Sequence, residues 1–197
     1  MNYKISNPSN LVLIGFMGSG KTSIGKRLAR RLGYEFLDSD TLIEKKTDRK
    51  IAEIFQTDGE KKFRELELAV LKDLLGRKKI ILATGGGAIL DPENQKILRS
   101  FGTLLWLDAT VDVLFDRAMR DGKRPLLEVE YPRQTFNELL KKRLPIYKAL
   151  CHMRVDTTRL SYEQTLTGIL DSTNEYLKNN IAPQNKLPFT DRPENMN

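Results

Sequence analysis

Residues 15–22 read Gly-Phe-Met-Gly-Ser-Gly-Lys-Thr, a complete match to the pattern G-x-x-x-x-G-K-[S/T]. An apolar run at 11–14 precedes this segment, and Ile24, Leu28 and Leu32 follow it on one helical face. A strand that runs through a glycine-rich turn into a helix start points backbone N–H groups and the positive helix end at one place, which suits a polyphosphate. The context therefore favours a nucleoside-triphosphate-binding loop over an ordinary glycine-rich turn.

Each part of this loop has an expected task. Its glycines let the backbone approach the phosphates without a Cβ in the way. Lys21 is expected to reach the β- and γ-phosphates, and the hydroxyl of Thr22 to hold Mg2+. The candidate nucleotide-binding residues of the loop are Gly18, Ser19, Gly20, Lys21, Thr22 and Ser23.

Length and composition limit the class of protein. The 197 residues, 40% of them hydrophobic, suffice for one well-packed domain and not for two. No apolar run is long enough to cross a bilayer, and residues 1–10 lack the apolar stretch of a signal peptide. A single cysteine, Cys151, and a single histidine, His152, can form neither an intramolecular disulfide nor a metal cluster. We therefore expect a cytoplasmic protein with no membrane partner.

The net charge of +7 is concentrated in one segment. Residues 117–154 carry ten basic and four acidic side chains, an excess of six. A nucleic-acid surface usually adds interleaved aromatic residues or a known binding module, and neither is present in the sequence. An arginine-rich segment beside a phosphate loop more simply faces ATP and an anionic substrate. We therefore expect no nucleic-acid partner.

Strand and helix patterns alternate along the chain. Apolar runs predict strands at 11–15, 79–84 and 103–107, and short strands are expected at 35–38 and 153–156. Helical spacing predicts helices at 21–32, from 91 onward, at 111–119, 134–150 and 162–177, and a helix-rich stretch at about 41–76 with breaks near 47–49 and 57–59. Pro145 should kink or restart its helix, and residues 120–132 read as a long loop.

This alternation implies βαβ units with right-handed crossovers, and hence an α/β fold with helices on both faces of a parallel sheet. Ligands of such folds lie beyond the carboxyl ends of the strands. The phosphate loop, the segment 38–40 and the glycine triplet 85–87 all fall at those ends. The polar, proline-bearing tail 179–197 is expected to be disordered and to lie outside a single domain at 1–178.

Two acidic residues, Asp38 and Asp40, follow the second predicted strand. One could serve the metal while the other accepts a hydrogen bond or a proton from an acceptor hydroxyl, the role that phosphoryl transfer requires. Either could instead cap the following helix, and for Asp38 the two interpretations are equally compatible with the sequence. Arg64 could likewise only pair with acids along its own helix.

These residues resemble the shikimate kinase family over positions 10–178. The resemblance rests on Gly15–Ser23, Asp38-Ser-Asp40, Ile51-Ala-Glu-Ile-Phe55, Asp58-Gly-Glu60, Phe63-Arg64, Gly85-Gly-Gly87, Arg124-Pro-Leu-Leu127, Arg143 with Tyr147, and Val155-Asp-Thr157. It implies ATP-dependent phosphorylation of the 3-hydroxyl of shikimate, in aromatic amino-acid biosynthesis. It also implies a three-layer fold of the nucleoside-monophosphate-kinase type, with a five-stranded parallel sheet, substrate-binding helices at about 41–76 and a lid at about 120–132.

On the acceptor side, the resemblance implies that Asp40 contacts the reacting hydroxyl and that Arg64 and Arg143 clamp the shikimate carboxylate. Glu67 would hold these arginines. Two guanidinium forks suit a planar carboxylate better than lysines do. The remaining implied contacts are backbone N–H groups of Gly85, Gly86 and Gly87 and a pocket wall of Phe55 and Phe63.

On the nucleotide side, Arg124 in the lid would reach the transferring phosphoryl group, and Arg117 would lie against adenine with Arg159 nearby. Thr22 would bind Mg2+ directly and Asp38 through water. The catalytic residues would be Asp40, Lys21 and Arg124. We expect a monomer.

Two other functions remain open from the sequence. A related small-molecule kinase, such as a gluconate kinase, would share the phosphate loop but should lack the paired arginines beside the glycine triplet. A non-catalytic nucleotide-binding module should lack both an acidic residue facing the acceptor and an arginine-bearing lid. The sequence carries all three features, and therefore favours a shikimate kinase over these two alternatives.

Overall fold

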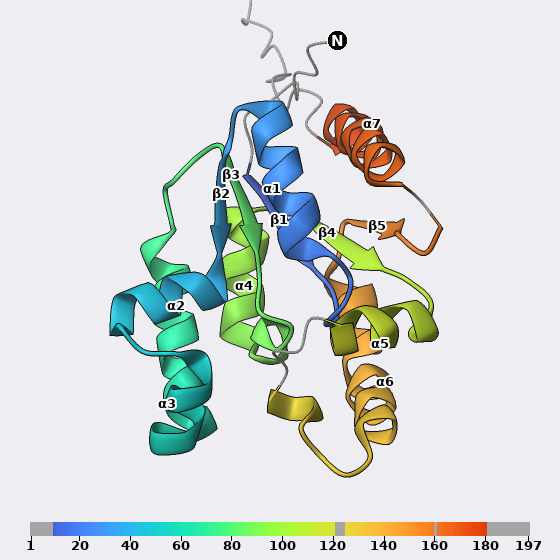
Figure 1. Cartoon of the computed structure of the whole chain (residues 1–197). Coiled ribbons are helices and arrows are strands. Elements are labelled where there is room, and N and C mark those ends of the chain that lie inside the picture. The colour runs from blue at the N-terminus through green and yellow to red at the C-terminus, as the bar shows by residue number, and fades with distance from the viewer. Residues whose placement is uncertain (1–9, 121–124, 160, 181–197) are drawn as a thin grey trace, which may run out of the picture.

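The structure is a computed structural model that describes residues 10–120, 125–159 and 161–180 (Figure 1). Its centre is a parallel sheet of five strands in the order β2-β3-β1-β4-β5. The strands are β1 (Asn10–Ile14), β2 (Glu35–Asp38), β3 (Ile80–Ala83), β4 (Gly102–Asp108) and β5 (Met153–Asp156). The predicted five-stranded parallel α/β sheet is therefore confirmed.

Helices separate the strands in sequence. They are α1 (Lys21–Leu32), α2 (Ser39–Thr47), α3 (Ile51–Asp73), α4 (Pro92–Phe101), α5 (Val111–Arg120), α6 (Pro132–Leu150) and α7 (Tyr162–Asn180), with short 3-10 turns η1 (Ala88–Leu90) and η2 (Pro125–Leu127). In Figure 1, α1 lies in front of the sheet and α4 behind it.

Two apolar layers enclose the sheet. On β1, Leu11 and Leu13 pack into a cluster with residues of α1 and α7. The alternate residues Val12 and Ile14 pack into a second cluster with residues of α3, α4, α5 and α6. All residues of β1 are buried because both faces of a parallel sheet are covered by helices. This explains why the strand reads as a continuous apolar run in the sequence.

The order of the strands determines where a ligand can bind. In the sheet, β3 lies on one side of β1 and β4 on the other. The chain leaves β1 toward β2, at one edge of the sheet, and leaves β3 in the opposite direction, toward β4. The carboxyl end of β1 is thus a topological switch point, the usual place for a ligand in an open α/β sheet. The loop at 15–22 begins there.

The α2–α3 region has a small core of its own, formed by Ile43, Ile54, Phe63 and Val70. The predicted break near 47–49 is confirmed, because α2 ends at Thr47 and α3 begins at Ile51. The predicted break at 57–59 is confirmed by Gly59, whose φ of 79° and ψ of 175° bend α3. Such a φ is readily adopted by glycine alone.

Three expectations need adjustment. Helix α6 runs unbroken across Pro145, so the helix does not restart there; buried side chains on both sides, Leu140 and Tyr147, hold its two halves on the core. The long loop at 120–132 contains the turn η2, and α6 begins at Pro132. Helix α7 extends to Asn180, two residues into the segment predicted to be a tail. Residues 181–197 lie outside the described residues.

Candidate active site

The phosphate loop follows β1 and is closely packed along its backbone. Gly15 has a φ of 148°, and a Cβ there would lie 2.3 Å from the carbonyl oxygen of Leu107. Gly18 has a φ of 79°, and a Cβ there would lie 2.2 Å from the carbonyl oxygen of Leu114. Both positions require glycine, because any side chain would collide with backbone of β4 or α5. The loop shape is therefore set by main-chain packing.

Lys21 and Thr22 open α1 directly after this loop. Lys21 Nζ donates to the carbonyl oxygens of Gly15, at 2.8 Å, and Phe16, at 3.1 Å, so its charge lies over the loop. The Thr22 hydroxyl donates to Asp38 Oδ2 at 3.0 Å. The two residues predicted to hold Mg2+, one in the first turn of α1 and one at the end of β2, are thus brought together, and both offer the oxygen ligands that this ion prefers.

The contacts of Asp38 confirm the helix cap, whereas its role toward the metal stays a prediction. Its Oδ1 accepts hydrogen bonds from the backbone N–H groups of Asp40, at 3.1 Å, and Thr41, at 3.4 Å, and so caps α2. Its Oδ2 remains directed to Thr22. A helix cap and a metal-side carboxylate are therefore compatible in one residue. Asp40 lies in the first turn of α2.

The glycine triplet 85–87 lies beneath three charged side chains. A Cβ at the first glycine would lie 2.5 Å from Asp40 Oδ1, and one at the second would lie 3.5 Å from Arg143 Nη1. A Cβ at the third would lie 2.7 Å from Arg64 Nη2. The triplet thus lets a carboxylate and two guanidinium groups from α2, α6 and α3 converge on one short backbone segment. The acceptor role that the sequence predicts for these three side chains stays a prediction.

One contact differs from expectation. The backbone N–H of Gly85 donates to the buried hydroxyl of Ser39 at 2.8 Å, so in this structure it serves the protein and does not point to a substrate. Sequence reasoning assigned Ser39 no role, although its place between two candidate acids was visible. Ser39 ties the start of α2 to the end of β3, and thereby holds Asp40 next to the triplet.

Arg64 is paired along its own helix and with a buried acid. Its Nη2 lies 2.8 Å from Glu60 Oε1, and its Nη1 lies 2.9 Å from Glu67 Oε2. Glu67 is fully buried, and this burial raises its pKa to about 7, against the opposing effect of Arg64. The simple helical pairing that the sequence allowed is therefore real, and Glu67 fixes one face of the guanidinium.

Arg143 lies on α6 and is 6% exposed. Its guanidinium carbon lies 5.4 Å from the ring centroid of Phe16 in the phosphate loop, and burial lowers its pKa. One turn later, the Tyr147 hydroxyl donates to the carbonyl oxygen of Gly86 at 2.9 Å, and its ring stacks on Trp106. Helix α6 is thus connected to the glycine triplet through Tyr147, a contact that sequence spacing alone could not reveal.

The two predicted wall residues pack against each other. The rings of Phe55 and Phe63 have centroids 4.7 Å apart, and Arg64 lies with its guanidinium carbon 5.1 Å from the centroid of Phe63. Phe63 is buried in the small core of the α2–α3 region, whereas Phe55 is half-buried. The aromatic pair therefore lies directly beside Arg64.

On the nucleotide side, Arg117 of α5 is held by the segment that follows β5. Its Nη1 donates to the Thr157 hydroxyl at 3.1 Å and its Nη2 to the Thr157 carbonyl at 3.0 Å. Arg159 is exposed two residues further on. The two residues predicted near adenine therefore belong to one corner of the molecule. Arg124 lies outside the described residues.

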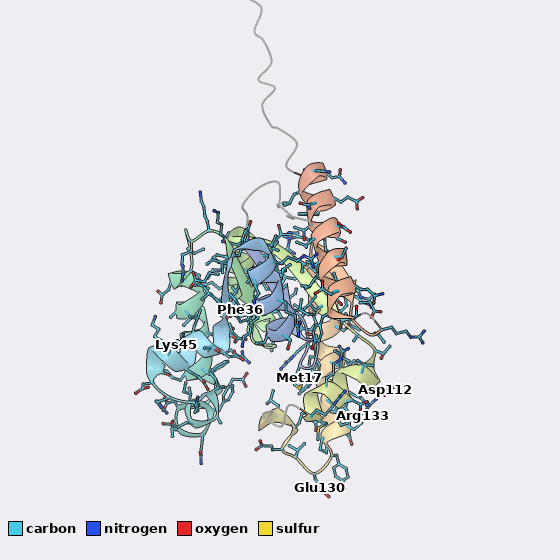
Figure 2. All side chains as sticks on the ribbon, turned by 45° about the horizontal axis from the view of Figure 1, so that its top comes forward. Met17, Phe36, Lys45, Asp112, Glu130 and Arg133 are labelled. Carbon is cyan, nitrogen blue, oxygen red and sulfur yellow. The ribbon has the colours of Figure 1, made fainter. Side chains whose placement is uncertain are left out.

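The two sides of the site flank the phosphate loop. Figure 2 shows Lys45 of α2 and Asp112 of α5 on opposite sides of Met17. The start of α6, which follows the expected lid, is tied to α5 by an ion pair between Arg133 and Asp112 and by contact of Arg133 with the Phe115 ring.

Within the part of the chain that the structure describes, no helix is long and apolar enough to span a bilayer.

Comparison with known proteins gives consistent matches. A family model described as shikimate kinase matches residues 17–174. A shikimate kinase of Thermodesulfovibrio yellowstonii is 44% identical over 161 residues, which cover 82% of this chain and 92% of that protein. A shikimate kinase of Chromobacterium violaceum is 42% identical over 162 residues, covering 82% and 88%.

Two solved structures resemble this chain to different degrees. The shikimate kinase from Acinetobacter baumannii in complex with shikimate has a TM-score of 0.81 and 41% identity, covering 90% of this chain and 97% of that chain. A gluconokinase from Sinorhizobium meliloti has a TM-score of 0.60 and 22% identity, covering 88% of this chain and 95% of that chain. The second likeness extends to the fold alone.

Proposed function

The chain belongs to the shikimate kinase family and is an ATP-dependent kinase of shikimate; we propose that it phosphorylates the 3-hydroxyl through the residues described above. The observation that carries this assignment of residues is the convergence of Asp40, Arg64 and Arg143 on the glycine triplet 85–87. A six-membered-ring acid with one reacting hydroxyl needs such a pair of contacts: guanidinium groups for the carboxylate and a carboxylate for the hydroxyl.

On the acceptor side, Arg64 and Arg143 bind the substrate carboxylate. The pairing of Arg64 with Glu67 and the burial of Arg143 against Phe16 orient both guanidinium groups before the substrate arrives. Asp40 then accepts a hydrogen bond from the reacting hydroxyl and takes up its proton as the hydroxyl oxygen bonds to the γ-phosphorus of ATP. The bond from this phosphorus to the β,γ-bridging oxygen breaks, and ADP leaves. Phe55 and Phe63 supply an apolar wall beside this clamp.

On the donor side, the phosphate loop binds the β- and γ-phosphates of ATP through its N–H groups and Lys21. Mg2+, when bound, neutralises negative charge on these phosphates, and Thr22 with Asp38 would hold it. Arg117 and Arg159 contact the adenine side. Arg124 adds positive charge at the transferring phosphoryl group from the lid, which we place at about 120–132.

We further propose a cytoplasmic monomer without nucleic-acid partners, built from one domain at 1–178 with substrate-binding helices at about 41–76. The lack of a nucleic-acid partner is supported by the surplus basic charge, which lies in 117–154 together with arginines assigned to ATP and the substrate carboxylate. Light scattering after size-exclusion chromatography tests the monomer. A mass of two chains at micromolar concentration would contradict it.

A coupled assay of ADP release tests the substrate. Release should depend on shikimate and should be absent with gluconate, because the gluconokinase likeness reaches 22% identity and the fold only. NMR of the product should place the phosphate on the 3-hydroxyl. Equal turnover with gluconate, or a phosphate on another hydroxyl, would overturn the proposed acceptor geometry.

A further inference from the structure

A buried amide adjoins the acceptor site from a helix that the mechanism does not use. Asn94 lies in the first turn of α4, where its backbone N–H donates to the cap residue Asp91 at 3.2 Å. Its side chain is fully buried, although an amide loses free energy on burial unless it is hydrogen-bonded. Its Nδ2 donates to Glu67 Oε2 at 3.3 Å. That bond connects α4 to the acid that holds Arg64.

The two donors share one oxygen of Glu67. Arg64 Nη1 and Asn94 Nδ2 both reach Oε2, at 2.9 Å and 3.3 Å. Among the described residues, Glu67 Oε1 and Asn94 Oδ1 have no hydrogen-bond partner. A buried carboxylate with one unpartnered oxygen is held in place by few contacts. Loss of either donor would therefore change how it is oriented.

We propose that Asn94 is a positioning residue for substrate binding: through Glu67 it keeps the Arg64 guanidinium aligned with the carboxylate of shikimate. This inference rests on the proposed role of Arg64 in binding that carboxylate. Glu67 and Arg64 separate Asn94 from the expected position of the substrate. Asn94 therefore acts on affinity for shikimate and has little effect on phosphoryl transfer itself.

The charges around Glu67 predict how this role depends on pH. Burial and the acids Asp40 of α2 and Asp91 of α4 raise the pKa of Glu67, whereas Arg64 on its own helix lowers it. Arg143 of α6 lies next to the middle glycine of the triplet. A donor to a carboxylate favours its charged form. Removing the Asn94 donor should raise the pKa of Glu67 further.

A neutral Glu67 attracts Arg64 less strongly than a charged one. Affinity for shikimate should therefore weaken as pH falls through about 7 in the wild type. In a variant without the Asn94 donor, the same weakening should begin at a higher pH. If Asn94 only filled space in α4, its replacement would lower the stability of the fold and leave the pH dependence of the affinity for shikimate unchanged.

The experiment compares Asn94→Leu and Asn94→Asp, two variants of similar size that lack the amide donor, over pH 6–9. The KM for shikimate at pH 7 should rise roughly three- to tenfold, with kcat and the KM for ATP within about twofold. The rise should shrink toward pH 9. Asn94→Asp should show the larger shift because it adds a second carboxyl group beside Glu67.

Glu93→Gln is the matched control. Glu93 is the preceding residue on α4, and its carboxylate pairs with Lys72 of α3 at 2.7 Å, so the variant also removes a contact between these two helices. Both side chains of that pair are about half exposed. The KM for shikimate and its pH profile should stay at wild-type values in this variant.

Circular dichroism and ATP binding show that each variant is folded, and Asn94→Ser replaces any that is not. A lower kcat or stability with an unchanged pH profile would overturn the inference.

The variant Arg64→Lys distinguishes failure of this inference from failure of the proposed function. A raised KM for shikimate there, with none in the Asn94 variants, refutes only the role of Asn94. An unchanged KM in Arg64→Lys refutes the carboxylate clamp itself.

Discussion

The phosphate loop and the acceptor site lie side by side but are built in different ways. The loop takes its shape from one continuous segment, 15–22, in which glycines are packed against backbone carbonyls of β4 and α5. The acceptor site takes its charges from α2, α3 and α6, which converge on the glycine triplet 85–87. The first is a matter of local backbone conformation, and the second of tertiary packing. Substitutions should therefore have different signatures on the two sides.

The largest effect is expected in the loop. Lys21→Ala should reduce phosphoryl transfer at least about a thousandfold, because it removes the positive charge directed at the transferring phosphate. The fold should persist, since this side chain lies over the loop and not in the core. ADP release measures the first expectation and thermal melting the second. Retained turnover would show that the loop binds nucleotide without directing the reaction.

On the acceptor side, Asp40→Asn should lower kcat roughly 100- to 10,000-fold while ATP binding is kept. The variant preserves shape and removes the charge that accepts the proton. Stopped-flow turnover and equilibrium titration with nucleotide separate the two quantities. Near-normal turnover would mean that Asp40 only shapes the first turn of α2.

A smaller effect should appear on substrate affinity. Arg143→Lys should raise the KM for shikimate roughly ten- to a hundredfold, because an ammonium group cannot form the paired bonds of a guanidinium. The KM for ATP should change little. A parallel rise in both constants would place Arg143 between the two halves of the site, in keeping with its contact to Phe16.

Tyr147→Phe should have a modest effect, because only a hydroxyl is lost. The carbonyl oxygen of Gly86 then has no donor from α6, and we expect the melting temperature to fall by roughly 2–8 °C. The KM for shikimate should rise severalfold as the glycine triplet loosens. A stability loss with an unchanged KM would show that this contact supports only the fold.

The last expected effect is a pH dependence of stability. Burial raises the pKa of Glu67 from 4.5 to about 7, so the folded chain holds this proton more tightly than the unfolded chain. Stability contributed by this group therefore falls as pH rises from about 5 to above 7. The melting temperature of Glu67→Gln, compared with that of the wild type, should therefore rise as pH rises over that range. If the difference in melting temperature between this variant and the wild type were the same at pH 5 and pH 8, Glu67 would stay charged over that range.

The sequence by itself determined most of the helices and strands of this protein and the position of the phosphate loop. The loop pattern at 15–22, the cap at Asp91 and the break at Gly59 depend on residues that are neighbours in the chain, and all three are present in the structure. The three central strands, β1, β3 and β4, were predictable for the same reason, because burial on both faces leaves a continuous apolar run.

Only the tertiary structure decided how the acceptor side is held. The bond from Gly85 to Ser39 and the link from Tyr147 to Gly86 join residues that are distant in sequence. The contact of Thr22 with Asp38, next to the phosphate loop, likewise depends on tertiary packing. The same holds for Asn94 and Glu67, 27 positions apart. Spacing along a chain predicts which face a residue occupies, but contacts between elements arise from packing.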